Sequence, residues 1–100
     1  MSTADALKQE GVTLFQQADY EAAARKFQQA EDAYAEANQP DMVAEMKVNV
    51  GLVHLKLEEP QQALDLMQEA LRAFQERGDT FRAAQVLGNM GGVYEALGDQ

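Results

Sequence analysis

The feature that most constrains this chain is a sequence pattern that recurs every 40 residues. The matched positions are Gly11, Gly51 and Gly91, and, one per unit, Ala23 and Ala63, Phe27 and Met67, and Ala30 and Ala70. A fixed period of this length is typical of stacked supersecondary units. Glycine inside a helix costs about 1 kcal/mol relative to alanine, so three glycines at one phase need a packing reason. We therefore expect two helix backbones to approach closely at Gly51, with the small Ala63 on the opposing helix.

Composition and turn residues together predict an all-α fold. Ala, Gln, Glu and Leu predominate, and these residues are strong helix formers. Turn signals occur at Asp19, Asn38–Pro40, Glu59–Pro60 and Gly78–Asp79, with Asp19 expected as an N-cap and Ser2 with Asp5 as a weak capping box. They divide the chain into five antiparallel helices, at about residues 3–18, 20–38, 40–58, 60–77 and 80–97. The third helix is apolar on two faces, so we expect it to have neighbours on both.

We expect a single domain, residues 1–100, that is organised as an α-solenoid. Its units are a first repeat at about 1–39, a second at about 40–79 and a half repeat at about 80–100. The fifth helix carries Leu87, Met90, Tyr94 and Leu97 at helical spacing, and the sequence offers no following helix to cover them. We expect either a fragment of a longer array or a second copy that covers this stripe in a homo-oligomer.

The sequence excludes several classes of function. Cysteine is absent, which removes disulfides, thiolate metal sites and a cysteine nucleophile. The net charge is −9 and the few cations are scattered, so nucleic acid is not an expected partner. No apolar run approaches the ~18 residues of a membrane span, and the expected location is cytoplasmic. His54 is the single histidine and is expected to be a packed or edge residue. We predict no enzyme, catalytic residue, metal site or cofactor.

The small and aromatic positions resemble the tetratricopeptide repeat over the whole chain. The residues that carry the resemblance are Leu7, Gly11, Leu14, Tyr20, Ala23, Phe27 and Ala30 in the first unit, Gly51, Pro60, Ala63, Met67 and Ala70 in the second, and Gly91, Tyr94, Gly98 and Asp99 in the third. Lys47, His54 and Pro60 depart from the usual residue types. The period exceeds the usual ~34 residues, as in kinesin light chains and Leu-Gly-Asn repeat proteins, and Leu87-Gly88-Asn89 is similar to the signature of the latter.

This resemblance implies a groove that binds a peptide or helix of a partner protein. Gln9, Asn49 and Asn89 share one helical phase, which in similar long-repeat proteins faces the concave side and bonds to the backbone of an extended peptide. A side-chain amide offers a donor and an acceptor together, so it can bind a main chain of any sequence. The alternative is that these amides are ordinary surface residues. The rest of the expected groove is Val12, Phe15, Glu45, Val48, Leu52, Leu55 and Lys56. The alternative for its apolar members is burial between adjacent helices.

Two functions therefore remain open. The first is a non-enzymatic scaffold that binds a protein or peptide in the groove. The second is an assembly module that joins copies of the chain through Leu87, Met90, Tyr94 and Leu97 of the fifth helix.

Overall fold

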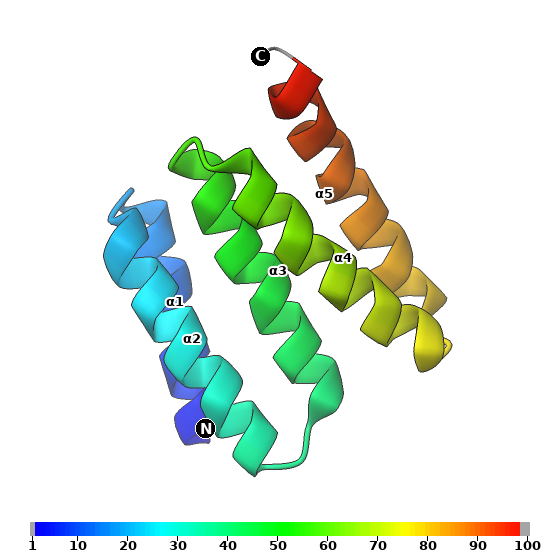
Figure 1. The fold of residues 1–100 in the computed structure, drawn as a ribbon. Helices are drawn as coiled ribbons and strands as arrows, with labels where there is room; N and C mark the ends of the chain where they lie inside the picture. The colour runs from blue at the N-terminus through cyan, green and yellow to red at the C-terminus, as the bar shows by residue number, and fades with distance from the viewer. Residues whose placement is uncertain (1, 99–100) are drawn as a thin grey trace.

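A computed structural model describes residues 2–98 of the chain. It contains five α-helices: α1 (Thr3–Gln16), α2 (Tyr20–Glu36), α3 (Pro40–Lys56), α4 (Pro60–Glu76) and α5 (Thr80–Gly98). Over residues 2–98 there is no β-strand. Successive helices run antiparallel, and α3 lies between the α1–α2 pair and the α4–α5 pair (Figure 1). The expected all-α helical repeat is confirmed, and the stack measures 41 × 33 × 17 Å along its principal axes, a thin slab. Asp99 and Gln100, the end of the expected half repeat, lie outside the described residues.

The four turns share one backbone geometry and occur every 20 residues. The residues Ala18, Asn38, Glu58 and Gly78 have φ angles of 62°, 60°, 60° and 71°. After each of them, the next backbone N–H donates to a carbonyl five residues earlier, as from Asp19 to Leu14 at 2.9 Å and from Glu59 to His54 at 2.8 Å. This bond satisfies a carbonyl at the end of the preceding helix and holds the left-handed residue in place.

The helix N-termini are capped in different ways. The Ser2 hydroxyl accepts a hydrogen bond from the Asp5 backbone N–H at 3.0 Å, as expected, and the Asp79 carboxylate accepts one from the Arg82 backbone N–H at 3.1 Å. Asp19 occupies the N-cap position of α2, as expected, although its side chain makes no capping hydrogen bond. Its ψ is 72°, whereas the extended backbone at Ser2 has a ψ of 162° and directs the hydroxyl toward the first turn.

Two glycines allow close packing within the helix pairs. A Cβ added to Gly11 would lie 2.6 Å from Cε1 of the Phe27 ring, and one added to Gly51 would lie 3.3 Å from the Ala63 carbonyl oxygen and 3.4 Å from Met67 Cε. The expected close approach at Gly51 is therefore present. At Gly91 an added Cβ would meet no atom within 4 Å. Gly91 therefore has the phase of Gly11 and Gly51, but within residues 2–98 no helix packs against it.

The core consists of two clusters that share α3. Tyr34 and Phe74 are the largest fully buried side chains of the two clusters, each 1% exposed. Met46, Val50 and Val53 of α3 pack with α1 and α2, whereas Ala44 and Val48 of the same helix pack with α4 and α5. This two-sided burial agrees with the two apolar faces of the third helix.

The face of α5 that packs inward differs from the expected stripe. Met90 is only 5% exposed and belongs to the core, and Leu97 is partly buried against the same cluster. Leu87 and Tyr94 are 53% and 52% exposed, and Phe81 is 72% exposed. The prediction that Leu87, Met90, Tyr94 and Leu97 form one uncovered stripe is therefore wrong for Met90 and Leu97. The stripe Ala83–Val86–Met90–Val93 faces the core instead, because α5 carries two apolar stripes and the spacing alone does not rank them.

Candidate functional site

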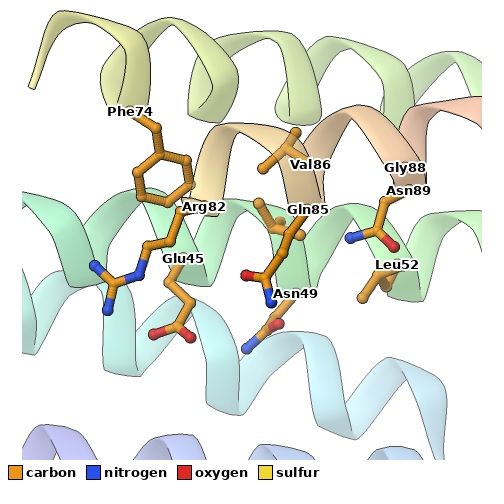
Figure 2. A pocket seen from close by; sticks show the side chains of 10 residues that line it. Glu45, Asn49, Leu52, Phe74, Arg82, Gln85, Val86, Gly88 and Asn89 are labelled. Atoms are coloured by element: carbon orange, nitrogen blue, oxygen red, sulfur yellow. The ribbon is translucent and has the colours of Figure 1, made fainter. Parts of the chain in front are cut away.

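A cleft of about 390 Å³ lies between α3 and α5, with Phe74 of α4 at its side. Arg82 and Glu45 lie at one end of this cleft, and Asn89 and Leu52 lie at the other (Figure 2). The lining residues are Glu45, Val48, Asn49, Leu52, Phe74, Arg82, Gln85, Val86, Gly88 and Asn89. We call this space the α3–α5 cleft.

Matched positions of successive units form the two walls of the α3–α5 cleft. Asn49 and Asn89 are 40 residues apart, and so are Glu45 and Gln85. Gln85 is absent from the set of expected groove residues, although its 40-residue offset from Glu45 is a signal that would have found it. Three side-chain amides thus lie around one cleft, where each provides two N–H donors and a carbonyl acceptor.

A second, smaller hollow extends the same surface toward α1. It has a volume of about 100 Å³ and is lined by Val12, Phe15, Phe27, Asn49 and Leu52. The Phe15 ring packs edge-to-face on Tyr20, with ring centroids 5.4 Å apart, which fixes its orientation beside the hollow. Asn49 and Leu52 line both spaces, so one surface runs over α1, α3 and α5.

Three of the ten expected groove residues do not line this surface. Gln9 lines an open hollow of about 580 Å³ on the other side of α1, together with Glu10, Thr13 and Lys26. Leu55 is partly buried against the core cluster shared by α3, α4 and α5, and Lys56 is an exposed residue at the end of α3. The expectation that these three residues join Asn49 is therefore wrong. Gln9 has the phase of Asn49, but among the first helices of the three units, α1, α3 and α5, the described residues place a helix on both sides of α3 alone.

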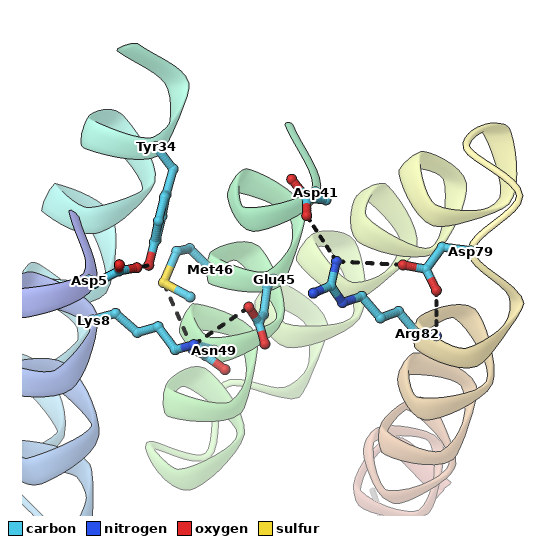
Figure 3. Close-up of polar contacts among 9 residues, drawn as sticks. All are labelled: Asp5, Lys8, Tyr34, Asp41, Glu45, Met46, Asn49, Asp79 and Arg82. Carbon is cyan, nitrogen blue, oxygen red and sulfur yellow. Dashed lines mark hydrogen bonds and ion pairs between the residues drawn. The ribbon is translucent and has the colours of Figure 1, made fainter. Parts of the chain in front are cut away.

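Ion pairs hold the charged side chains at the edge of the α3–α5 cleft (Figure 3). Arg82 Nη1 lies 3.2 Å from Asp41 Oδ2 and 3.5 Å from Asp79 Oδ2, and the guanidinium is 5.9 Å from the centroid of the Phe74 ring. Burial raises the pKa of Asp41, but the hydrogen bond and charge of Arg82, together with backbone N–H groups at the start of α3, hold that pKa below its ordinary value. Glu45 is paired with Lys8, with Nζ and Oε2 3.7 Å apart. The charges at this edge are thus largely compensated within the protein.

The side-chain amide of Asn49 forms few hydrogen bonds with the rest of the protein. Its Nδ2 donates to the Met46 sulfur at 3.9 Å, and within residues 2–98 no other side-chain hydrogen bond of Asn49 is present. Thioether sulfur is a weak acceptor, so the amide retains most of its capacity for a ligand.

Lys47 and His54, two of the residues that depart from the usual types, lie on the side of the slab opposite the α3–α5 cleft. Lys47 Nζ lies 3.1 Å from Glu31 of α2 and 3.4 Å from Glu69 of α4. Burial alone would lower the pKa of Lys47, but the hydrogen bond and charge of Glu31, with Glu69, raise it above its ordinary value. His54 Nδ1 lies 2.9 Å from Glu59 Oε1, so it is an edge histidine tied to the turn before α4. These residues connect helices.

Other kinds of site find no support in the described part of the chain. Across residues 2–98, no three histidine, aspartate or glutamate side chains come together as a metal site. None of the five helices is long and apolar enough to cross a membrane.

The comparisons with known proteins agree with the repeat geometry. No curated protein and no solved structure matches the chain significantly. A sequence model described as "Tetratricopeptide repeat" matches residues 42–100, which span α3, α4 and α5 and hence both walls of the α3–α5 cleft. Repeats of this kind generally mediate protein–protein interactions and are typically not enzymes. The 40-residue period, the paired helices and this match together show that the chain belongs to the tetratricopeptide-repeat family.

Proposed function

We propose that this protein is a non-enzymatic scaffold that binds an extended segment of a partner protein in the α3–α5 cleft. The observation that carries the proposal is that Asn49 and Asn89, from matched positions of two helices, line one cleft of about 390 Å³. Members of the family typically bind proteins, which fits a polypeptide ligand.

The lining chemistry suits a main chain with alternating apolar side chains. The side-chain amides of Asn49, Gln85 and Asn89 would form hydrogen bonds with backbone N–H and C=O groups of the ligand. These groups lose their bonds to water on binding and would otherwise remain unsatisfied. Val48, Leu52 and Val86 give the cleft an apolar floor for one or two ligand side chains. Hydrogen bonds to the ligand's main chain and apolar contacts with the floor would together provide the affinity. The floor alone would favour particular ligand side chains.

The test is a peptide-array screen on the purified protein, followed by fluorescence anisotropy with the best peptide. Asn49→Ala, Asn89→Ala and Leu52→Asp should each weaken binding at least tenfold without a comparable loss of thermal stability. Gln68→Ala, on the exposed face of α4, is the matched control and should bind like the wild type. Full affinity in all three groove variants would contradict the proposal.

A second candidate function is assembly of two copies through the exposed face of α5. It is favoured by Phe81, Leu87 and Tyr94, three large apolar side chains that are each more than half exposed on one helix. Across α5 the charged residues are Arg82 and Glu95, which cancel, so this helix adds no net repulsion between two chains of net charge −9. Sedimentation velocity would show a dimer that Tyr94→Glu converts to a monomer. A monomer throughout the micromolar range would contradict this candidate.

A further inference from the structure

Glu45 is the less neutralised of the two charged side chains that line the α3–α5 cleft, the other being Arg82. The Arg82 guanidinium donates hydrogen bonds to two carboxylates, that of Asp41 at 3.2 Å and that of Asp79 at 3.5 Å. Glu45 has one cation beside it, Lys8, whose Nζ lies 3.7 Å from Oε2, beyond hydrogen-bond distance. Within residues 2–98 the Glu45 carboxylate accepts no side-chain hydrogen bond. The positive charge of the cleft therefore has two partners, and the negative charge has one distant partner.

Lys8 is, moreover, shared between two carboxylates. The hydrogen bonds from Tyr34 and Ser2, and then the charge of Lys8, hold the pKa of Asp5 below its ordinary value against the effect of burial. Asp5 is therefore ionised at neutral pH and competes with Glu45 for Lys8. The row of side chains in Figure 3 runs across α1, α3 and α5 and contains two cations, Lys8 and Arg82, and four carboxylates, Asp5, Asp41, Glu45 and Asp79. The field at this edge of the cleft is negative, and the net charge of −9 adds to it.

We propose that the segment bound in the α3–α5 cleft carries a lysine or arginine side chain that binds Glu45. A ligand cation would give Glu45 the hydrogen-bonded partner that Lys8 does not provide, and charge-assisted hydrogen bonds are about twice as strong as neutral ones. An anionic ligand residue would instead compete with Asp41 and Asp79 for Arg82. Because this ligand occupies the α3–α5 cleft, its charge rests on the proposed function, whose amides and apolar floor leave that charge open.

The length of the cleft relates this cation to an apolar anchor on the ligand. Glu45 lies at one end of the cleft and Leu52 at the other (Figure 2). Their separation along the axis of α3 is about 10 Å, which an extended chain spans in about three residues. Leu52 also lines the apolar hollow of about 100 Å³ beside Phe15, which has room for about one aliphatic side chain. We expect the basic residue about three positions from an aliphatic residue of the ligand.

A second copy of this chain is a poor occupant on charge. Its 100 residues include 17 acidic and 8 basic side chains, so it would bring further negative charge to a cleft edge that is already negative. Like charges across an interface oppose binding, whereas a basic segment of another protein would be attracted to the same edge. The charge balance thus favours a basic partner over a self-contact.

The experiment is an array of nine-residue peptides with capped ends, probed with the purified protein. Each peptide carries one leucine and, at every distance on either side of it, one lysine, norleucine or glutamate. The other positions contain serine, threonine and valine in equal proportion. Lysine peptides should predominate among the binders when the lysine lies about three residues from the leucine. Fluorescence anisotropy should show that they bind at least fivefold more tightly than the matched norleucine peptides, and glutamate peptides should bind most weakly.

Variants of the protein test whether Glu45 causes this preference. Glu45→Gln keeps the size of the side chain and should reduce the ratio of lysine to norleucine affinity to less than twofold. Asp65→Asn removes one negative charge on the opposite side of the slab, where Asp65 lines a hollow with His54, and should keep the wild-type ratio. Lys8→Gln removes the competing cation and should strengthen binding of the lysine peptide at least twofold. Lys26→Gln changes the net charge equally at the hollow beyond α1 and should have no such effect.

The outcomes separate this proposal from the proposed function. If peptides bind and Asn49→Ala weakens them, but lysine and norleucine peptides bind alike, the proposed function stands and the cationic ligand is wrong. A lysine preference that persists in Glu45→Gln, or that is equal at every distance from the leucine, would come from the net charge and would also overturn the proposal. If no peptide binds, both proposals fail. A dimer of the free protein that Asn49→Ala dissociates would place a second copy in the cleft and would overturn the basic partner.

Discussion

The Tyr34 hydroxyl, on a side chain only 1% exposed near the end of α2, donates a hydrogen bond to the Asp5 carboxylate in the first turn of α1 (Figure 3). Burial raises the pKa of the Tyr34 phenol, and the bond to Asp5 raises it further, so the phenol stays protonated at neutral pH. The same bond, together with one from Ser2, holds the pKa of Asp5 below its ordinary value of 3.8.

Tyr34→Phe should lower the stability of the protein at neutral pH, and the effect should fade in acid. A carboxyl whose pKa is depressed in the folded state stabilises the fold above its unfolded pKa, and this contribution disappears as the pH falls through the folded pKa. Urea unfolding at pH 7 and pH 3 checks this, with the wild type measured beside the variant. An equally large difference at both pH values would show that the lost bond does not involve an ionised Asp5.

The two covered glycines should differ in their tolerance of alanine. Gly11→Ala places a Cβ 2.6 Å from a buried aromatic ring and should cost about 1–3 kcal/mol. Gly51→Ala should cost less, because its contacts begin at 3.3 Å and include the flexible end of Met67, whereas Gly51→Leu should cost at least as much as Gly11→Ala. Gly92→Ala, in open space, should stabilise by up to about 1 kcal/mol. Thermal unfolding checks the order, and equal midpoints for all four variants would contradict it.

Backbone conformation can be separated from space by comparing Gly78 with Gly92. Neither glycine has an atom within 4 Å of an added Cβ, but Gly78 has a φ of 71°. Gly78→Ala should therefore destabilise by about 1 kcal/mol, the opposite sign to Gly92→Ala. Glu58→Gly should stabilise by a similar or smaller amount, because Glu58 holds a φ of 60° without being a glycine. Chemical denaturation of the three variants gives the comparison, and a stabilised Gly78→Ala would be the contrary result.

Arg82→Ala should remove the ion pair with Asp41 and destabilise the N-terminal turns of α5. The pKa of Asp41, measured by NMR titration, should rise, because burial then acts with less opposition. The loss of two partly exposed ion pairs and the contact with Phe74 should cost about 1 kcal/mol. Hydrogen exchange should increase first in the N-terminal turns of α5. Arg82→Lys should recover only part of the effect, and full recovery would show that charge alone matters.

The sequence predicts the repeat well because its signals are local. Pro40, Asn38 and Gly78 mark helix ends by their own backbone preferences, and the helices begin within a residue of the expected positions. The first four helices end one or two residues early, because the left-handed residue at each turn follows the last helical residue by two positions, whereas α5 ends one residue later than expected. Ala18 and Glu58 have no preference for that conformation and adopt it through the recurring hydrogen bond.

The site is predicted less completely because it depends on which helices are neighbours. Asn49 and Asn89 follow from the period, and the structure places both on one cleft. Gln9 shares their phase but lines a different hollow, together with Glu10, Thr13 and Lys26. Met90 and Tyr94 both fit a helical stripe, and only the position of α4 against α5 decides that the first is buried and the second exposed.

The identical turns at Ala18, Asn38, Glu58 and Gly78 limit the lengths by which a chain like this one can grow or shrink. Removing 20 residues would preserve the turn geometry but place two helices of the same kind in succession, so that a glycine would meet a glycine or an aromatic ring would meet a methionine. Removing 40 residues would keep each turn and each glycine contact in phase. Insertions and deletions in such a gene should therefore be accepted in steps of one whole helix pair.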